Sequence, residues 1–244
     1  TVDAAPADTW LPRETLTVAS GLTHWITENA KSTRAFLKRV EAAVGIAAPV
    51  QGQHITELPR AAHKKGDHTP QAEGDAQARE LLAPAVQGHN IGLVSEAGMP
   101  AIADPGSSVV RAAHALGLVV VPLTGPVSLM LALAASGLNG QGFAFVGYVP
   151  QDSAERHKRL RELDAMAGKT GQTQILIETP YRNAALLQAL LTSLQPNTRH
   201  GPRSKPLSCV AEFPGAGFIS RRFDEHVLSR PARGRSADAA GGGG

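Results

Sequence analysis

The chain has 244 residues, of which 42% are hydrophobic and 4% aromatic, and it carries a formal net charge of +3. This length suits one large α/β domain or two small ones, each with a buried core. The longest apolar run, around Leu129–Ala135, is far shorter than the ~20 residues that span a bilayer, so we expect no membrane association.

In chain order, hydrophobic periodicity and turn signals predict an alternation of strands and helices. The expected strands are His24–Glu28, His54–Leu58, Gly92–Val94, Leu118–Val121 and Gln174–Glu178. The expected helices are Ser32–Val44, Pro70–Val86, Gly106–Leu116, Ser128–Ser136, Asp152–Met166 and Tyr181–Leu194. We therefore predict three segments: a cofactor-binding α/β domain at 1–147, a second and incomplete α/β domain at 148–200, and an irregular or disordered tail at 201–244.

The segment Ile91–Tyr148 carries the strongest functional signal. Its apolar runs Gly92–Val94 and Leu118–Val121 are typical of buried parallel strands. The loops that follow them, Ser95–Gly106 and Thr124–Ser128, are rich in Gly and Pro and would lie at the carboxyl ends of those strands. Ligands bind at that edge of an open α/β sheet, and glycine lets backbone approach them closely. The pattern predicts a site for a small-molecule cofactor.

Several short motifs in this order resemble the class III S-adenosylmethionine-dependent methyltransferases, the tetrapyrrole methylase family. The resemblance is greatest to the branch that methylates a ribose 2′-oxygen in small-subunit ribosomal RNA. The motifs are Ser95-Glu96-Ala97-Gly98-Met99-Pro100, Ala103-Asp104-Pro105-Gly106, Pro122-Leu123-Thr124-Gly125-Pro126, Ala135-Ser136-Gly137-Leu138, Phe145-Val146-Gly147-Tyr148-Val149-Pro150 and Ile177-Glu178-Thr179-Pro180-Tyr181-Arg182.

The resemblance implies a two-domain tetrapyrrole methylase-like α/β fold, with a parallel sheet in the N-terminal domain and a smaller, mixed sheet in the C-terminal domain. It also implies a homodimer that binds S-adenosylmethionine between its domains. The methyl acceptor would be ribosomal RNA or a tetrapyrrole, and a non-catalytic ligand-binding member is a further alternative. The implied cofactor-binding residues are Glu96, Ala97, Gly98, Met99, Gly125, Pro126, Val127, Ser128, Tyr181 and Arg182.

Three groups of candidate residues also have plain structural interpretations. Asp104 or Ser107 is expected to cap the helix that starts near Gly106, which we favour over a chemical role. Glu28 is the candidate general base, although a surface or helix-start role is favoured for it. Tyr181 and Arg182 are as compatible with a structural tyrosine and a solvated arginine as with ligand contact.

The charge distribution gives no argument for RNA binding by the folded body. Residues 201–244 hold seven Lys/Arg and four Asp/Glu, so the whole surplus of +3 lies in this segment. The single cysteine, Cys209, excludes a disulfide framework, and the scattered histidines predict no metal site. Residues 1–10 lack the features of a secretory signal, so we expect a cytoplasmic protein.

Both ends of the sequence depart from the family pattern. The resemblance implies a hydrophobic strand before Thr1 that lies inside the first sheet, and a run of hydrophobic strands where residues 201–244 stand. We therefore expect an incompletely covered sheet edge in this chain.

Overall fold

The computed structural model describes residues 6–59, 72–96, 98–195, 209–211 and 218–219. The helices are η2 (Ala7–Thr9), α1 (Arg13–Gly21), α2 (Ala30–Val44), η3 (Val50–Gly52), α4 (Ala72–Leu81), α5 (Ala83–Val86), α6 (Ser107–Ala115), α7 (Ser128–Ser136), α8 (Ser153–Thr170), η4 (Pro180–Arg182) and α9 (Asn183–Ser193). The strands are β1 (His24–Thr27), β2 (His54–Glu57), β3 (Ile91–Val94), β4 (Phe143–Phe145), β5 (Thr173–Ile177), β6 (Cys209–Ala211) and β7 (Phe218–Ile219).

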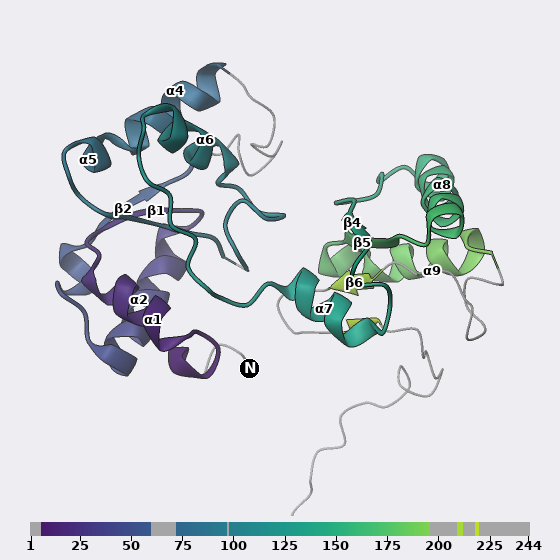
Figure 1. The fold of residues 1–244 in the computed structure, drawn as a ribbon, viewed down its shortest axis with the longest axis horizontal. Coiled ribbons are helices and arrows are strands. Elements are labelled where there is room, and N and C mark those ends of the chain that lie inside the picture. The colour runs from purple at the N-terminus through teal and green to yellow at the C-terminus, as the bar shows by residue number, and fades with distance from the viewer. Residues whose placement is uncertain (1–5, 60–71, 97, 196–208, 212–217, 220–244) are drawn as a thin grey trace, which may run out of the picture.

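The first sheet is entirely parallel and has the strand order β2-β1-β3. Successive side chains of a strand point to opposite faces, so Trp25 packs with α1 and α2 while Ile26 packs on the side of α4 and α6. Figure 1 shows these helices on the two sides of β1 and β2. The indole Nε1 of Trp25 donates a hydrogen bond to Oε1 of Gln53 at 2.8 Å, which satisfies its polar atom in the core.

Gly92 of β3 allows this packing, because the Trp25 ring occupies the position that the Cβ atom of any other residue at 92 would take. A Cβ atom at Gly92 would collide with Cε3 and Cζ3 of Trp25 and would lie 3.0 Å from Cδ1 of Leu22. Such close approach is a common reason for glycine inside a strand.

We therefore expect Gly92→Ala to lower the free energy of unfolding by about 1–3 kcal/mol, because the buried indole must move. Urea denaturation followed by tryptophan fluorescence measures this. Gly52→Ala is the control, since a Cβ there meets no atom within 4 Å. Equal stability of the two variants would contradict the packing.

The second sheet has the order β4-β5-β6-β7 and is mixed, since β6 and β7 are antiparallel. Leu176 of β5 faces Leu160 of α8 and Leu186 of α9, whereas the neighbouring Ile175 packs against α7. Helices thus cover both faces of β5, as in the first sheet. The α/β fold with one parallel and one mixed sheet agrees with the sequence prediction.

Leu118–Val121 is not a strand, which corrects the prediction for this segment. Residues 118–127 instead form the irregular connection that runs from α6 to α7, as Figure 1 shows. Val119 is 88% exposed and Val121 is 67% exposed. An apolar run becomes a buried strand only when a neighbouring strand pairs with it, and here the first sheet ends with β3 on this side.

We expect Val119→Lys and Val121→Lys each to change the free energy of unfolding by no more than about 0.5 kcal/mol, as is usual at exposed positions. Thermal unfolding checks this. A loss of about 2 kcal/mol or more would mean that the segment is buried in solution, as the sequence pattern indicated.

Other boundaries also differ from the sequence predictions. The helix expected at Pro70–Val86 is divided at Leu82 into α4 and α5, with Pro84 in the first turn of α5, and α1 was not predicted at all. The segment 201–244 contains β6 and β7, so the expectation of an irregular tail is wrong for these five residues; the rest of it lies outside the described residues. The domain boundary at 147 stays a prediction, although β4 lies before it and pairs with β5 beyond it.

Candidate functional site

The carboxyl ends of β1 and β3 form the edge of the first sheet at which the predicted site lies. Thr27 pairs in register with Val94, so Glu28 and Ser95 occupy corresponding positions just beyond the two strands. The backbone N–H of Glu96 donates a hydrogen bond to Oε2 of Glu28 at 3.0 Å. This bond joins two loops that are 68 residues apart in the sequence and fixes the start of the predicted cofactor loop.

Helix α2 begins two residues after Glu28, at Ala30. Asn29 is its N-cap, and its side-chain oxygen accepts hydrogen bonds from the N–H groups of Lys31 and Ser32. The N–H of Ala30 donates to Oε1 of Glu57, at 2.8 Å, from the end of β2. The helix-start role that the sequence favours for Glu28 is therefore filled by Asn29.

The loop from Gly98 to Gly106 contains an unusual concentration of left-handed backbone. Gly98 has φ of +145° and Gly106 of +135°, and the two alanines Ala101 and Ala103 have φ of +66° and +65°. Left-handed backbone costs a non-glycine residue roughly 1–2 kcal/mol. Strain of this kind gathers where a loop must hold a particular shape for a ligand.

Asp104 does not cap helix α6, contrary to the prediction. The N-cap is Gly106, with no side-chain hydrogen bond to the helix, and Ser107 is already its first helical residue. Oδ2 of Asp104 would instead lie 3.6 Å from a Cβ atom at Gly98, and its carboxyl group shares a hydrogen bond with Ser95. The Ser95 hydroxyl is also 3.0 Å from the carbonyl oxygen of Gly98, so its single proton is donated to one of these two acceptors at a time. The Asp104 side chain is thus directed at the predicted cofactor loop.

Burial raises the pKa of Asp104 to about 6, and the nearby charges of Glu28 and Glu96 add to the effect. The hydrogen bond from Ser95 acts in the opposite direction. Asp104 therefore lies within electrostatic reach of two other carboxyl groups at this edge of the sheet, and its own carboxyl group loses its proton only near pH 6.

This pKa predicts a pH-dependent stability. Because the pKa is higher in the folded chain than in the unfolded one, the folded state binds more protons between about pH 4 and pH 6, and stability is lost as pH rises through 6. We expect Asp104→Asn to remove this loss and to raise the free energy of unfolding at pH 7 by about 1 kcal/mol, a figure reduced for solvent screening. Urea denaturation at pH 4 and pH 7 measures it; the same difference from wild type at both values would contradict the assignment.

The second sheet contributes Tyr148, Glu178, Tyr181 and Arg182. Burial raises the pKa of Tyr148, and the charges of Asp104, from the first sheet's edge, and Glu178 raise it further. Glu178 and Arg182 form an ion pair, with Nη2 and Nε of Arg182 at 2.6 and 2.8 Å from Oε1 of Glu178. The Arg182 guanidinium carbon lies 5.7 Å from the centre of the Tyr181 ring, which is itself 82% exposed. Tyr148 therefore lies within electrostatic reach of charged groups from both sheets.

The structure brings together some of the predicted site residues. Glu28, Glu96 and Gly98 gather at the edge of the first sheet; Met99 belongs to the same loop, and Ala97 lies outside the described residues. Tyr181 and Arg182 stand on η4 beside Tyr148.

The second predicted loop, Thr124–Ser128, contacts helix α1 and the residues just before it. Gly125 is adjacent to Leu11, and the hydroxyl of Thr15 donates to the carbonyl oxygen of Thr124 at 2.6 Å. Val127 is the N-cap of α7. Gly125–Ser128 therefore leads into the helix that packs on the second sheet and does not follow a strand. A ligand role for Gly125, Pro126, Val127 and Ser128 stays a prediction.

Asp104 and Tyr148 are the candidate residues that sequence reasoning missed. The sequence pattern favours a helix cap for Asp104, and Tyr148 appears in it only as a member of the motif Phe145-Val146-Gly147-Tyr148-Val149-Pro150. The signal for Asp104 was the glycine after Pro105, since Gly106 can itself serve as the N-cap. Nothing in the sequence pattern around Tyr148 indicated that Asp104 lies near it, because the two are brought together only by the approach of the two sheets.

The carboxyl edge of the parallel sheet thus carries a glycine-containing loop and acidic groups, and ionisable residues of the second sheet lie opposite. Such an arrangement is typical of α/β proteins that bind small molecules. The sequence profile of the tetrapyrrole (corrin/porphyrin) methylases matches residues 24–201. The chain belongs to this family.

Three curated relatives carry the name ribosomal RNA small subunit methyltransferase I. The Vibrio cholerae protein is 38% identical over 128 residues, which are 52% of this chain and 42% of the relative. The Pseudomonas aeruginosa protein is 41% identical over 51% of this chain and 40% of its own length, and the Bacillus subtilis protein is 33% identical over 56% and 44%. The aligned region thus spans less than half of these relatives. A crystal structure of the methyltransferase CobJ has a TM-score of 0.45 and 18% identity, covering 78% of this chain and 73% of that one.

Proposed function

We propose that the chain is an S-adenosylmethionine-dependent methyltransferase whose acceptor is a ribose 2′-hydroxyl of small-subunit ribosomal RNA. The observation that carries the proposal is the family match over residues 24–201. The name that the three relatives share supports ribosomal RNA over a tetrapyrrole as the acceptor. We further expect a homodimer in the cytoplasm.

The residues at the edge of the first sheet fit the cofactor chemically. S-adenosylmethionine would supply an electrophilic methyl group on a positively charged sulfonium, and carboxylates favour a nearby positive charge. Glu28, Glu96 and Asp104 provide that negative potential. Gly98 leaves backbone uncovered where a Cβ atom would otherwise project toward Asp104. We propose Glu96–Met99 as the loop that holds the cofactor, with Tyr181 and Arg182 on the opposite side.

The chain's own contribution to the reaction would be positioning, exclusion of water and removal of one proton. Glu28 was the base candidate of the sequence analysis, and its Oε2 accepts a hydrogen bond from Glu96 that holds the loop. Asp104 is the second candidate base. A general base works best when its pKa is close to the operating pH, and the pKa of Asp104 is about 6.

The first test is calorimetric titration of the full chain with S-adenosylhomocysteine, the product, which cannot turn over. We expect micromolar affinity, that is, about 8 kcal/mol of binding free energy. Absence of binding to a chain with cooperative thermal unfolding would contradict the proposed function.

The acceptor is tested by methyl transfer from labelled S-adenosylmethionine to small ribosomal subunits. Binding to RNA is expected to weaken steeply as salt is raised, whereas binding to a tetrapyrrole is not. Transfer to a tetrapyrrole in place of the ribosomal subunit would overturn the choice of acceptor. Glu28→Gln and Asp104→Asn, compared in the same assay, would show which carboxylate takes the proton.

A further inference from the structure

A stack of three histidines lies at the opposite edge of the first sheet from the site described above. His24 is the first residue of β1 and His54 the first of β2, and their rings are 4.6 Å apart and nearly parallel, at 18°. His89, which precedes β3, stacks on the other side of His24 at 4.5 Å and 28°. This is the amino edge of the parallel strands, so the stack is separate from the loops that follow their carboxyl ends.

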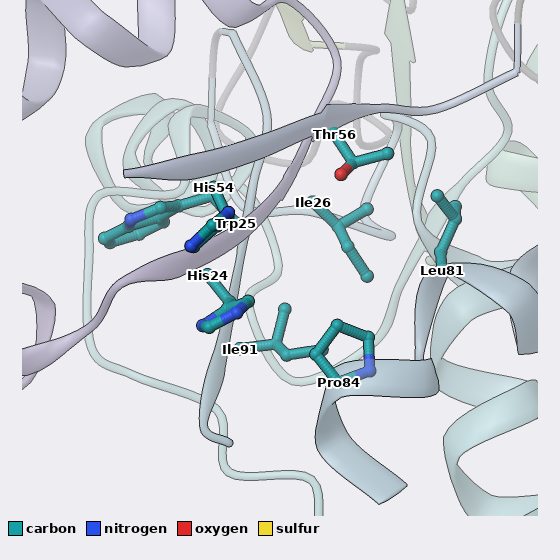
Figure 2. Close-up of a pocket in the computed structure, with 8 residues that line it drawn as sticks. All are labelled: His24, Trp25, Ile26, His54, Thr56, Leu81, Pro84 and Ile91. Atoms are coloured by element: carbon teal, nitrogen blue, oxygen red, sulfur yellow. The ribbon is translucent and has the colours of Figure 1, made fainter. Parts of the chain in front are cut away.

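A cavity of about 220 Å³ adjoins the stack. Figure 2 shows His24 and His54 on one side of it, with Ile26, Leu81 and Pro84 on the other. Residues two apart on a strand share a face, so Ile26 lies beyond His24 and Thr56 beyond His54, both on the side covered by α4 and α5. The cavity therefore has a polar, ionisable wall and an apolar wall.

A second cavity, of about 470 Å³, continues from the first and shares Thr56, Leu81 and Pro84 with it. Its further walls include Gln77 and Glu80 of α4. Glu80 is the acidic group along this path, and it lies at the far end from the histidines. The two cavities together form one groove with histidines at one end, an apolar middle and a carboxylate at the other end.

We propose that this groove is a second small-molecule site, which binds a monoanion with an apolar body, such as an aromatic monocarboxylate, with the anionic group at His24 and His54. The apolar body would lie against Ile26, Ile91 and Pro84. The first cavity is smaller than most ligand pockets, which limits the part of the ligand that it holds to about the size of one ring. Glu80 would repel a second negative charge, so a dianion is disfavoured.

Protonation of the stack gives the site a pH dependence. Partial burial lowers the pKa of His24, and the charges of His89 and His54 lower it further. Three parallel rings at these distances resist carrying more than one positive charge. A bound anion offsets that repulsion, so it binds together with a proton, and affinity is expected to rise as pH falls below the usual range of histidine. The other titratable group along the groove is Glu80 of α4.

The arrangement is not that of a metal site. Stacked rings direct their nitrogen atoms side by side and not toward one point, and Nδ1 of His24 is already 3.0 Å from the hydroxyl of Thr23. Among the described residues, no group of three or more His, Cys, Asp or Glu is placed to hold a metal ion.

The test is NMR of the full chain with labelled histidine side chains and Ile and Leu methyl groups. Benzoate is the probe, benzamide its neutral counterpart and terephthalate its dianionic one. We expect benzoate to shift the resonances of His24, His54 and Ile26, with about tenfold higher affinity near pH 5.5 than near pH 7.5. Benzamide should bind more weakly and without pH dependence, and terephthalate more weakly than benzoate.

Two variants make the result specific. His54→Ala removes an exposed ring of the stack and should reduce the affinity and its pH dependence, since His24 and His89 remain, whereas His114→Ala, an exposed histidine of α6, should change nothing. Leu81→Phe fills the groove from the opposite wall and should reduce binding at both pH values. The proposal is overturned if benzoate shifts none of these resonances near pH 5.5, if benzamide binds equally well, or if His54→Ala retains the full pH-dependent affinity.

Discussion

Replacement of Gly98 by valine is expected to weaken the binding of S-adenosylhomocysteine by about ten- to a hundredfold, because a β-branched residue at φ of +145° carries about 1–3 kcal/mol of backbone strain. A Cβ atom at this position would be 3.6 Å from Oδ2 of Asp104, which is ordinary contact. The penalty therefore comes from the backbone, and the loop would relieve it by moving away from the shape that faces Asp104. Calorimetry measures the change.

The matched control is Gly88→Val. Gly88 also has positive φ, at +95°, and a Cβ there meets no atom within 4 Å, but it precedes β3 at the amino edge of the sheet. We expect this variant to lose comparable stability while its affinity for S-adenosylhomocysteine stays unchanged. Equal loss of affinity in both variants would show that the effect of Gly98→Val is a general loss of folding, and unchanged affinity in both would remove the loop from the cofactor site.

The second large effect is expected for Arg182→Ala. The side chain of Glu178 is only 2% exposed, and Arg182 holds it through two charge-assisted contacts. Removing one partner of a buried ion pair leaves the other charge without its counter-ion, which costs up to about 3–5 kcal/mol, although the N–H and hydroxyl of Thr179 still donate to Oε1 of Glu178. We therefore expect a loss of this order in the free energy of unfolding, measured by urea denaturation.

A surface pair of the same residue types provides the comparison. Arg159 and Glu162 are 3.4 Å apart on α8, and both side chains are more than 40% exposed, so Arg159→Ala should cost no more than about 0.5 kcal/mol. The double variant Glu178→Gln with Arg182→Ala should recover part of the loss, since no buried charge is then left. A loss as small as that of Arg159→Ala would mean that the pair is open to water in solution.

If both expectations hold, the two residues have different kinds of importance. Gly98 would shape the ligand site with a modest effect on stability, whereas Arg182 would secure the segment on which Tyr181 stands. The family resemblance assigns both to a single group of cofactor-binding residues. Measuring affinity and stability separately distinguishes a contact with the ligand from support of the site.

Much of the local structure was predictable from the sequence, because it depends on residues close to one another in the chain. The apolar face of α2, the closing Gly137 of α7, which has left-handed φ of +68°, and the Asp152 cap of α8 are all local signals. The order of the short motifs likewise indicated the family, and the family profile confirmed it.

Long-range contacts decided the rest. Leu118–Val121 has the composition of a buried strand, but a strand needs hydrogen-bonding neighbours, and the sheet provides none beyond β3 among the described residues.

The side chain of Asp104 is available to the cofactor loop because Gly106, and not Asp104, is the N-cap of α6. Its raised pKa depends on Glu28 and Glu96, and only the pairing of β1 with β3 brings Glu28 to this edge of the sheet. The raised pKa of Tyr148 and the stacking of the three histidines likewise depend on residues that are far apart in the sequence. Sequence patterns indicate which side chains are buried and where the chain turns. The electrostatic environment of a group is set instead by residues that become adjacent only after folding.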